Sequence, residues 1–255
     1  MWILRAIRTA GSKGISENII PPVEDTTKLR FNWPEELRPL EGMPHAVVRE
    51  FTLVRDRLTI VVPGYRSSGE KPKYEDIISD ILIKGDSAVI STNNPDPYNQ
   101  GLDVYANSIR EQVIALVDYA IINSKRLTGR ENAKITLYGS SAGGGAVALV
   151  AGLYPDIIDS VILTGPSLDV TEGLTDHLLE LIRPFPGKVF FIRSEGDLIC
   201  NPDVVREYSR ILGNSRELDV HSIPGNDHAF ESPENHEQLR RFLVESFNSL
   251  KVVEQ

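Results

Sequence analysis

The segment Gly139-Ser140-Ser141-Ala142-Gly143 places a serine two residues from a glycine on each side. This G-x-S-x-G pattern is typical of a nucleophile elbow, a tight turn that exposes a serine hydroxyl between a strand and a helix. The glycines suit such a turn because the residues two before and two after the serine come close together. Ser141 is therefore the candidate nucleophile, whereas Ser140 has the bulky Tyr138 two positions before it.

The sequence on either side of Ser141 has the pattern that an elbow requires. Residues 134–138 predict a buried strand, and the small apolar residues 142–154 predict a buried helix. The N–H groups at the start of that helix would favour a negative charge forming beside Ser141. A tightly packed or phosphate-binding glycine turn is the alternative, although residues 143–145 lack the lysine of a phosphate-binding loop.

A serine hydroxyl becomes a good nucleophile only when a base takes its proton. Among the five histidines, His228 lies in a loop between the last predicted strand and the last predicted helix. Loops after parallel strands meet at one edge of the sheet, so His228 is the candidate general base for Ser141. The other histidines are expected to be surface or core residues: His45, His177, His221 and His236.

An acidic residue should orient the base, and Asp197 follows the predicted strand 189–193. A buried carboxylate beside a histidine fixes its tautomer and stabilises the imidazolium that forms. The alternative role for Asp197 is to cap the helix that begins near Asn201. The alternative acids are Glu195 and, after the preceding strand, Asp169.

Strands and helices alternate along the chain from about residue 57. Short apolar runs predict strands at 58–62, 88–90, 134–138, 161–163, 189–192 and 218–221. Helical spacing of apolar residues predicts helices near 74–82, 109–121, 142–154, 174–182, 202–212 and 239–250. This alternation predicts an α/β fold with a mostly parallel sheet of about eight strands and helices on both faces.

The first 56 residues do not follow the alternating pattern. They contain scattered prolines and two candidate strands, at residues 2–7 and 46–54, which we expect at an antiparallel edge of the same sheet. No repeat, linker or low-complexity stretch divides the chain. We therefore expect one domain over residues 1–255, with its core in residues 57–250.

The amino-acid composition disfavours several classes of binding partner and cofactor. The formal net charge is −9, which disfavours binding to nucleic acid and to anionic membrane surfaces. No run of about 18 apolar residues suggests membrane insertion, and no signal peptide is evident. The single cysteine, Cys200, leaves no disulfide and no zinc cluster, so we expect a cytoplasmic protein without a cofactor.

Four motifs together resemble the α/β-hydrolase superfamily over about residues 57–250. They are residues 61–65 (Val-Val-Pro-Gly-Tyr), 139–143 (Gly-Ser-Ser-Ala-Gly), 196–197 (Gly-Asp) and 227–228 (Asp-His). The resemblance implies that the backbone N–H groups of Tyr65 and Ala142 form the oxyanion hole. Members usually have His-Gly where this chain has Pro63-Gly64. Only about 20 residues separate Ser167 from Lys188, so no large cap domain is expected.

The resemblance implies a serine hydrolase that cleaves an ester or thioester of a small or medium soluble substrate. A peptidase or an acyltransferase would use the same three residues, and some members of the fold only bind ligands. The serine, the acid and the histidine are all present, which argues against a binding protein that has lost catalysis. Two groups of residues are candidates for substrate binding. Arg66 and Ser67 follow the expected oxyanion loop, and Asn94 lies at the end of a neighbouring predicted strand.

Overall fold

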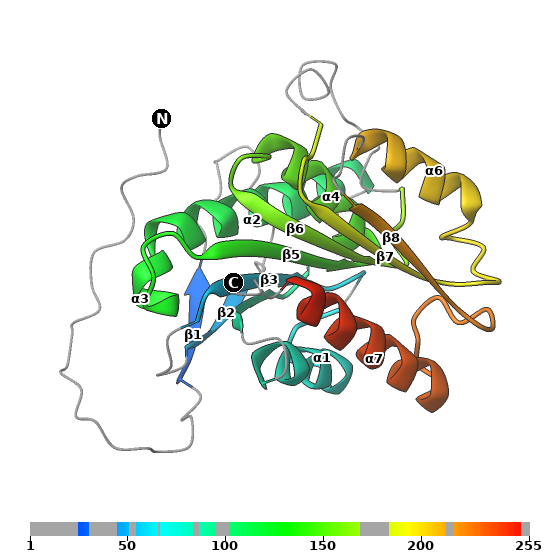
Figure 1. The fold of residues 1–255 in the computed structure, drawn as a ribbon, viewed down its shortest axis with the longest axis horizontal. Helices are drawn as coiled ribbons and strands as arrows, with labels where there is room; N and C mark the ends of the chain where they lie inside the picture. Colours follow the sequence, from blue (N-terminus) through cyan, green and yellow to red (C-terminus); the bar gives the residue numbers. More distant parts are fainter. Residues whose placement is uncertain are drawn as a thin grey trace.

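The computed structural model describes residues 25–30, 45–50, 55–65, 67–83, 87–94, 102–168, 184–212 and 217–250. Within them, eight strands form one sheet in the order β1-β2-β4-β3-β5-β6-β7-β8 (Figure 1). The strands are β1 (Asp25–Arg30), β2 (His45–Glu50), β3 (Arg57–Val62), β4 (Ser87–Thr92), β5 (Lys134–Ser140), β6 (Ile158–Thr164), β7 (Lys188–Ser194) and β8 (Glu217–Ile223).

Six neighbouring strands, in the order β4-β3-β5-β6-β7-β8, are parallel to one another, which confirms the predicted mostly parallel sheet. β1 and β2 pair antiparallel with each other, and β2 pairs antiparallel with β4. β2 overlaps the predicted strand at 46–54. β1 was not predicted, because its sequence contains a single apolar residue, Leu29. The predicted strand at 2–7 lies outside the described residues.

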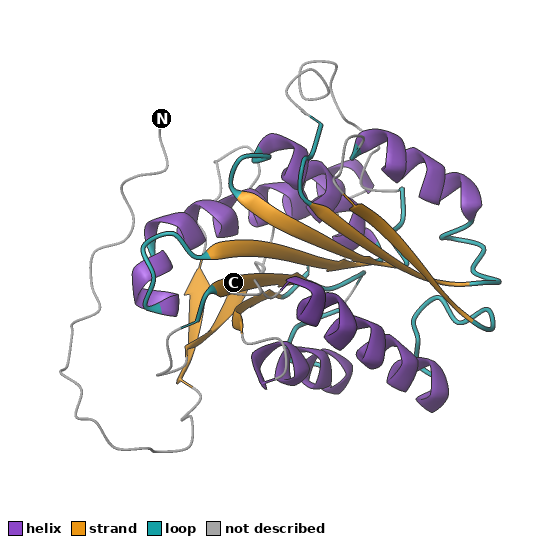
Figure 2. Cartoon of the chain, in the orientation of Figure 1, coloured by secondary structure: helices purple, strands orange, loops and turns teal. Residues whose placement is uncertain are grey.

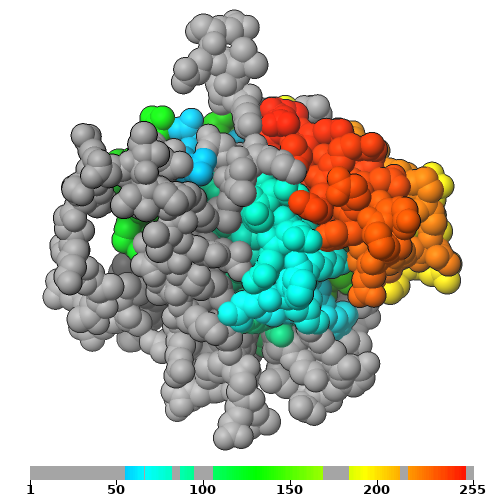
Figure 3. All heavy atoms as spheres, turned by 90° about the horizontal axis from the view of Figure 1, so that it is seen from below, coloured from blue at the N-terminus to red at the C-terminus, as the bar shows by residue number. Residues whose placement is uncertain are grey.

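Helices cover both faces of the sheet (Figure 2). They are α1 (Pro72–Ile83), α2 (Leu102–Ile122), α3 (Ser124–Thr128), α4 (Ala142–Leu153), α6 (Pro202–Ile211) and α7 (Pro233–Leu250). Figure 3 shows α1, in cyan, beside α7, in orange and red, on the lower face. The helix predicted at 174–182 lies outside the described residues. Among the helices described here, none has the length and apolar character needed to cross a membrane.

Alternate residues of the central strands enter two separate cores. In β3, Ile60 and Val62 pack into the core under α2 and α4, while Val61 packs into the core under α1 and α7. Covering both faces explains why every residue of β3 and β4 is buried, without alternation between buried and exposed positions. Burying each apolar side chain of these strands stabilises the fold by roughly 1.5–3 kcal/mol.

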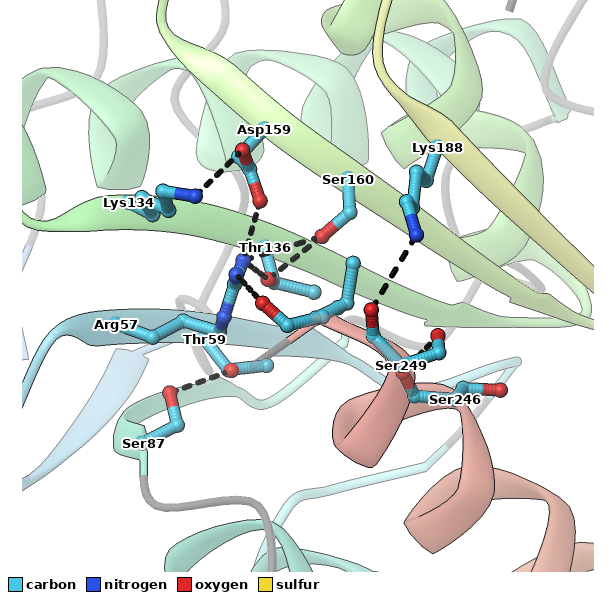
Figure 4. Close-up of polar contacts among 11 residues, drawn as sticks. Arg57, Thr59, Ser87, Lys134, Thr136, Asp159, Ser160, Lys188, Ser246 and Ser249 are labelled. Atoms are coloured by element: carbon cyan, nitrogen blue, oxygen red, sulfur yellow. Dashed lines mark hydrogen bonds and ion pairs between the residues drawn. The ribbon is translucent and has the colours of Figure 1, made fainter. Parts of the chain in front are cut away.

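A buried arginine ties the amino ends of three strands to the last helix (Figure 4). Arg57 Nη1 donates to Thr136 Oγ1 and Asp159 Oδ2, both at 2.7 Å, and to Ser160 Oγ at 3.3 Å. Its Nη2 donates to the carbonyl of Leu250 at 3.2 Å, at the end of α7. A cation at this place complements the helix dipole and satisfies a terminal carbonyl. One side chain thus joins β3, β5, β6 and α7.

Replacing Arg57 by methionine should lower the free energy of unfolding by about 3 kcal/mol, because it removes one partner of a largely buried ion pair. The Arg57 side chain is only 7% exposed, and Asp159 is 31% exposed. Urea denaturation followed by circular dichroism measures the change.

The matched control is Arg130→Met. Arg130 makes a comparable ion pair with Asp56 at 2.8 Å, but the two side chains are 57% and 74% exposed. Exposed pairs contribute about 0–1 kcal/mol, so this variant should stay close to the wild type. Equal losses in the two variants would contradict the structural role assigned to Arg57.

Candidate active site

Ser141 stands between β5 and α4 in a backbone conformation that L-amino acids rarely adopt, with φ 53° and ψ −123°. Such a conformation costs about 1–3 kcal/mol and persists only where its surroundings fix it. Here the N–H of Ser141 donates to the carbonyl of Thr164 at 2.9 Å. Its own carbonyl accepts from the N–H groups of Gly145 at 3.2 Å and Ser167 at 3.1 Å. Contacts from β6 and α4 thus hold the turn.

The glycines of the motif are required by close backbone approach. A Cβ added to Gly139 would lie less than 3 Å from the carbonyl of Gly143, and one added to Gly143 would lie less than 3 Å from the carbonyl of Val62. Gly64 is also close, since its added Cβ would lie 3.0 Å from Ser141 Cβ and 3.6 Å from Ser141 Oγ. The chain after β3 therefore packs directly against the serine.

The structure brings three of the predicted site residues together at the carboxyl edge of the sheet. His228 Nε2 lies 3.0 Å from Ser141 Oγ, and His228 Nδ1 lies 2.6 Å from Asp197 Oδ2. The Asp197 side chain is 1% exposed and that of His228 is 23% exposed. Of the alternative acids, Glu195 is exposed and Asp169 lies outside the described residues.

Both oxygens of Asp197 are hydrogen-bonded. While Oδ2 faces His228, Oδ1 accepts from the backbone N–H groups of Ile199 at 2.8 Å and Cys200 at 3.0 Å. The cap of α6 is a different residue, because Asn201 Oδ1 accepts from the N–H groups at the start of that helix. The carboxylate is thus buried, satisfied and fixed in direction.

The loop that carries His228 is anchored on both sides of the histidine. Before it, the carbonyl of Gly225 accepts from Ser194 Oγ at 2.7 Å and from the N–H of Gly196 at 2.6 Å. After it, Phe230 has φ 52°, an unusual value for a bulky residue, and its fully buried ring packs into the lower core. These contacts limit the positions that the imidazole can take.

The loop after β3 holds Tyr65 and two of the predicted substrate-binding residues. The side-chain amide of Asn94 donates to the carbonyls of Pro63 and of Gly64, the latter at 3.2 Å, and the N–H of Asn94 donates to the carbonyl of Ser67 at 3.0 Å. Asn94 thus holds the loop in place, a role that the sequence did not indicate. Arg66 lies outside the described residues.

The start of α4 lies on the other side of the serine. Ala142 is the first residue of this helix, and the first N–H groups of a helix have no acceptor within it. Sequence reasoning missed one more contact in this region. The N–H of Gly64 donates to the hydroxyl of Tyr74 at 3.2 Å, although Tyr74 begins the predicted helix 74–82, whose pattern indicates only an apolar face.

Comparisons with known proteins identify the fold. Neither a protein-family model nor a curated protein matches this sequence. Among solved structures, Est1E from Butyrivibrio proteoclasticus has a TM-score of 0.62 at 15% identity, with 88% of this chain and 98% of that chain covered. A dienelactone hydrolase from Anabaena variabilis gives 0.63 at 16%, covering 89% and 98%. Mouse alpha/beta hydrolase domain-containing protein 10 gives 0.63 at 14%, covering 89% and 100%. The chain has the α/β-hydrolase fold, as the sequence predicted.

Cys200 should resist alkylation in the folded protein. It is fully buried, and burial together with the nearby Asp197 carboxylate raises the pKa of its thiol to about 12. At pH 8 only about one part in ten thousand would be the reactive thiolate. Mass spectrometry after iodoacetamide treatment should find Cys200 unmodified in the native protein and modified in urea. Rapid labelling of the native protein would contradict this placement.

Proposed function

We propose that the protein is a serine hydrolase that cleaves a carboxylic ester, or a thioester, of a small to medium soluble substrate. The observation that carries the proposal is the unbroken chain of contacts from Asp197 through His228 to Ser141, at 2.6 and 3.0 Å. In this arrangement Nδ1 of His228 holds its proton toward the carboxylate. Nε2 is left to accept the proton of the serine.

The reaction follows from these positions. Ser141 Oγ attacks the carbonyl carbon while its proton passes to His228 Nε2, and the carboxylate of Asp197 stabilises the imidazolium. The imidazolium then returns the proton to the departing alcohol or thiol, which leaves an acyl group on Ser141. A water molecule attacks that acyl group with the same base, and the acid and the free serine are released.

The tetrahedral intermediates carry a negative oxygen that needs hydrogen-bond donors. We assign this role to the backbone N–H groups of Tyr65 and Ala142. In support, Gly64, directly before Tyr65, packs against Ser141, and Ala142 is the first residue of α4. Losing one such donor typically lowers kcat by about 10²–10³-fold. Because both donors belong to the backbone, Pro63 in place of the usual histidine removes neither of them.

Solved structures of the same fold guide the choice of substrates. They include esterases and a dienelactone hydrolase, and Est1E has been observed with bound ferulic acid. A substrate panel should therefore contain short acyl esters, aromatic acid esters, a thioester and a peptide anilide. Turnover of esters or the thioester supports the proposal. Turnover of the anilide alone would identify a peptidase, and no turnover together with no labelling by a fluorophosphonate would contradict a serine hydrolase.

Ser141→Ala should abolish both hydrolysis and fluorophosphonate labelling, with kcat reduced by about 10⁴-fold or more. The fold should remain, because alanine is as small as serine. Within the described residues, the hydroxyl of Ser141 makes one hydrogen bond, to His228. Kinetics, intact-mass spectrometry and circular dichroism test the three expectations. Ser249→Ala, in the last turn of α7, is the control and should be labelled normally.

The carboxylate beside the base gives a second test of the triad. Asp197→Asn should lower the rate by about 10⁴-fold, because the wrong tautomer of His228 would face Ser141. The measurement is kcat/KM on an activated ester.

The control for that measurement is a second carboxylate–histidine pair. In β8, Asp219 Oδ2 lies 3.0 Å from His221 Nε2, on a strand away from Ser141. Asp219→Asn should leave kcat/KM unchanged. An unchanged rate in Asp197→Asn would remove Asp197 from the mechanism.

A further inference from the structure

Tyr74 places a single hydroxyl group beneath the catalytic edge of the sheet. It belongs to the first turn of α1, and only 3% of the residue is exposed. Its ring packs in the lower core, and its hydroxyl accepts a hydrogen bond from the N–H of Gly64 at 3.2 Å. Its polar end is therefore directed at the loop that follows β3.

Burial keeps this hydroxyl in its neutral form. It raises the pKa of the Tyr74 phenol, and the hydrogen bond from the backbone of Gly64 offsets only part of that rise. The phenol is therefore neutral at physiological pH, with one O–H to donate and lone pairs to accept.

The partner of Tyr74 belongs to the first half of the assigned oxyanion hole. Gly64 directly precedes Tyr65, and a Cβ added to Gly64 would lie 3.0 Å from Ser141 Cβ, so this part of the loop packs against the nucleophile. We propose that Tyr74 is a positioning residue that holds the loop with the Tyr65 N–H donor in place beside Ser141, a role that rests on the hydrolase function proposed above.

The helix that carries Tyr74 is fixed well enough to serve as a reference. Its buried residues Ile77, Ile78 and Ile81 pack against the sheet and α7. On α7, Arg240 Nε donates to Asp80 Oδ2 at 2.6 Å, and the Asp80 side chain is nearly buried. Tyr74 therefore extends from a rigid element, and a movement of its hydroxyl would require α1 to shift.

Tyr74→Phe is the direct test, because it removes the hydroxyl and keeps the ring that fills the core. We expect kcat on an activated ester to fall about 10–100-fold, with KM changed less than about threefold, since the donors act mainly on the transition state. Affinity for a trifluoromethyl ketone, whose adduct with Ser141 carries the same oxyanion, should fall by a similar factor. A residue that only fills the core would not weaken that inhibitor in parallel with kcat.

Tyr119→Phe is the matched control. The ring of Tyr119 is also buried, in the upper core, and its hydroxyl accepts from Arg126, away from Ser141. This variant should keep the wild-type kcat and inhibitor affinity.

The outcomes separate this inference from the proposed function. If the wild type hydrolyses the ester and Tyr74→Phe stays within twofold of it in kcat and inhibitor affinity, Tyr74 has no positioning role. A rise in KM alone, or loss of kcat with unchanged inhibitor affinity, would also overturn the inference. If Tyr74→Phe does not fold, a Tyr74→Met variant that folds and keeps the wild-type kcat overturns it. A wild type that neither hydrolyses nor is labelled would instead reject the hydrolase function.

Discussion

The strained turn at Ser141 is the constraint on which the arrangement of the site depends. A serine with φ 53° at the end of β5 is stable only because β6 accepts its N–H, and because α4 and the segment after β6 donate to its carbonyl. The turn also needs Gly139 and Gly143, since no side chain fits between β5, α4 and the end of β3. The register of the central strands therefore determines where the hydroxyl stands.

The amino edge and the carboxyl edge of the sheet contribute differently to the protein. At the amino edge, Arg57 satisfies several acceptors with good geometry, and this edge stabilises the fold. At the carboxyl edge, the two described non-glycine residues with left-handed φ, Ser141 and Phe230, lie in the loops that carry the candidate nucleophile and base. Strain at functional loops is tolerated where the rest of the molecule supplies stability, and here the two buried cores and the arginine supply it.

Sequence reasoning predicted what local patterns determine. Glycine spacing predicted the turn at Ser141, and breaks after apolar runs predicted the loops that carry Asp197 and His228. The supporting contacts were not predictable, because Asn94 and Tyr74 meet the loop after β3 only once the sheet has formed. β1 was also missed, because its sequence contains one apolar residue and no alternation of apolar and polar residues.

The choice between the two carboxylates that follow β7 is decided by the turn that ends the strand. The N–H of Asp197 donates to the carbonyl of Ser194 at 3.3 Å, and this turn leaves Glu195 in solvent while it directs Asp197 inward beneath His228. The same turn aligns the N–H groups of Ile199 and Cys200 with the second oxygen of Asp197. A carboxylate held from both sides in this way cannot rotate away from the imidazole. The burial that would otherwise penalise its charge is offset by these hydrogen bonds.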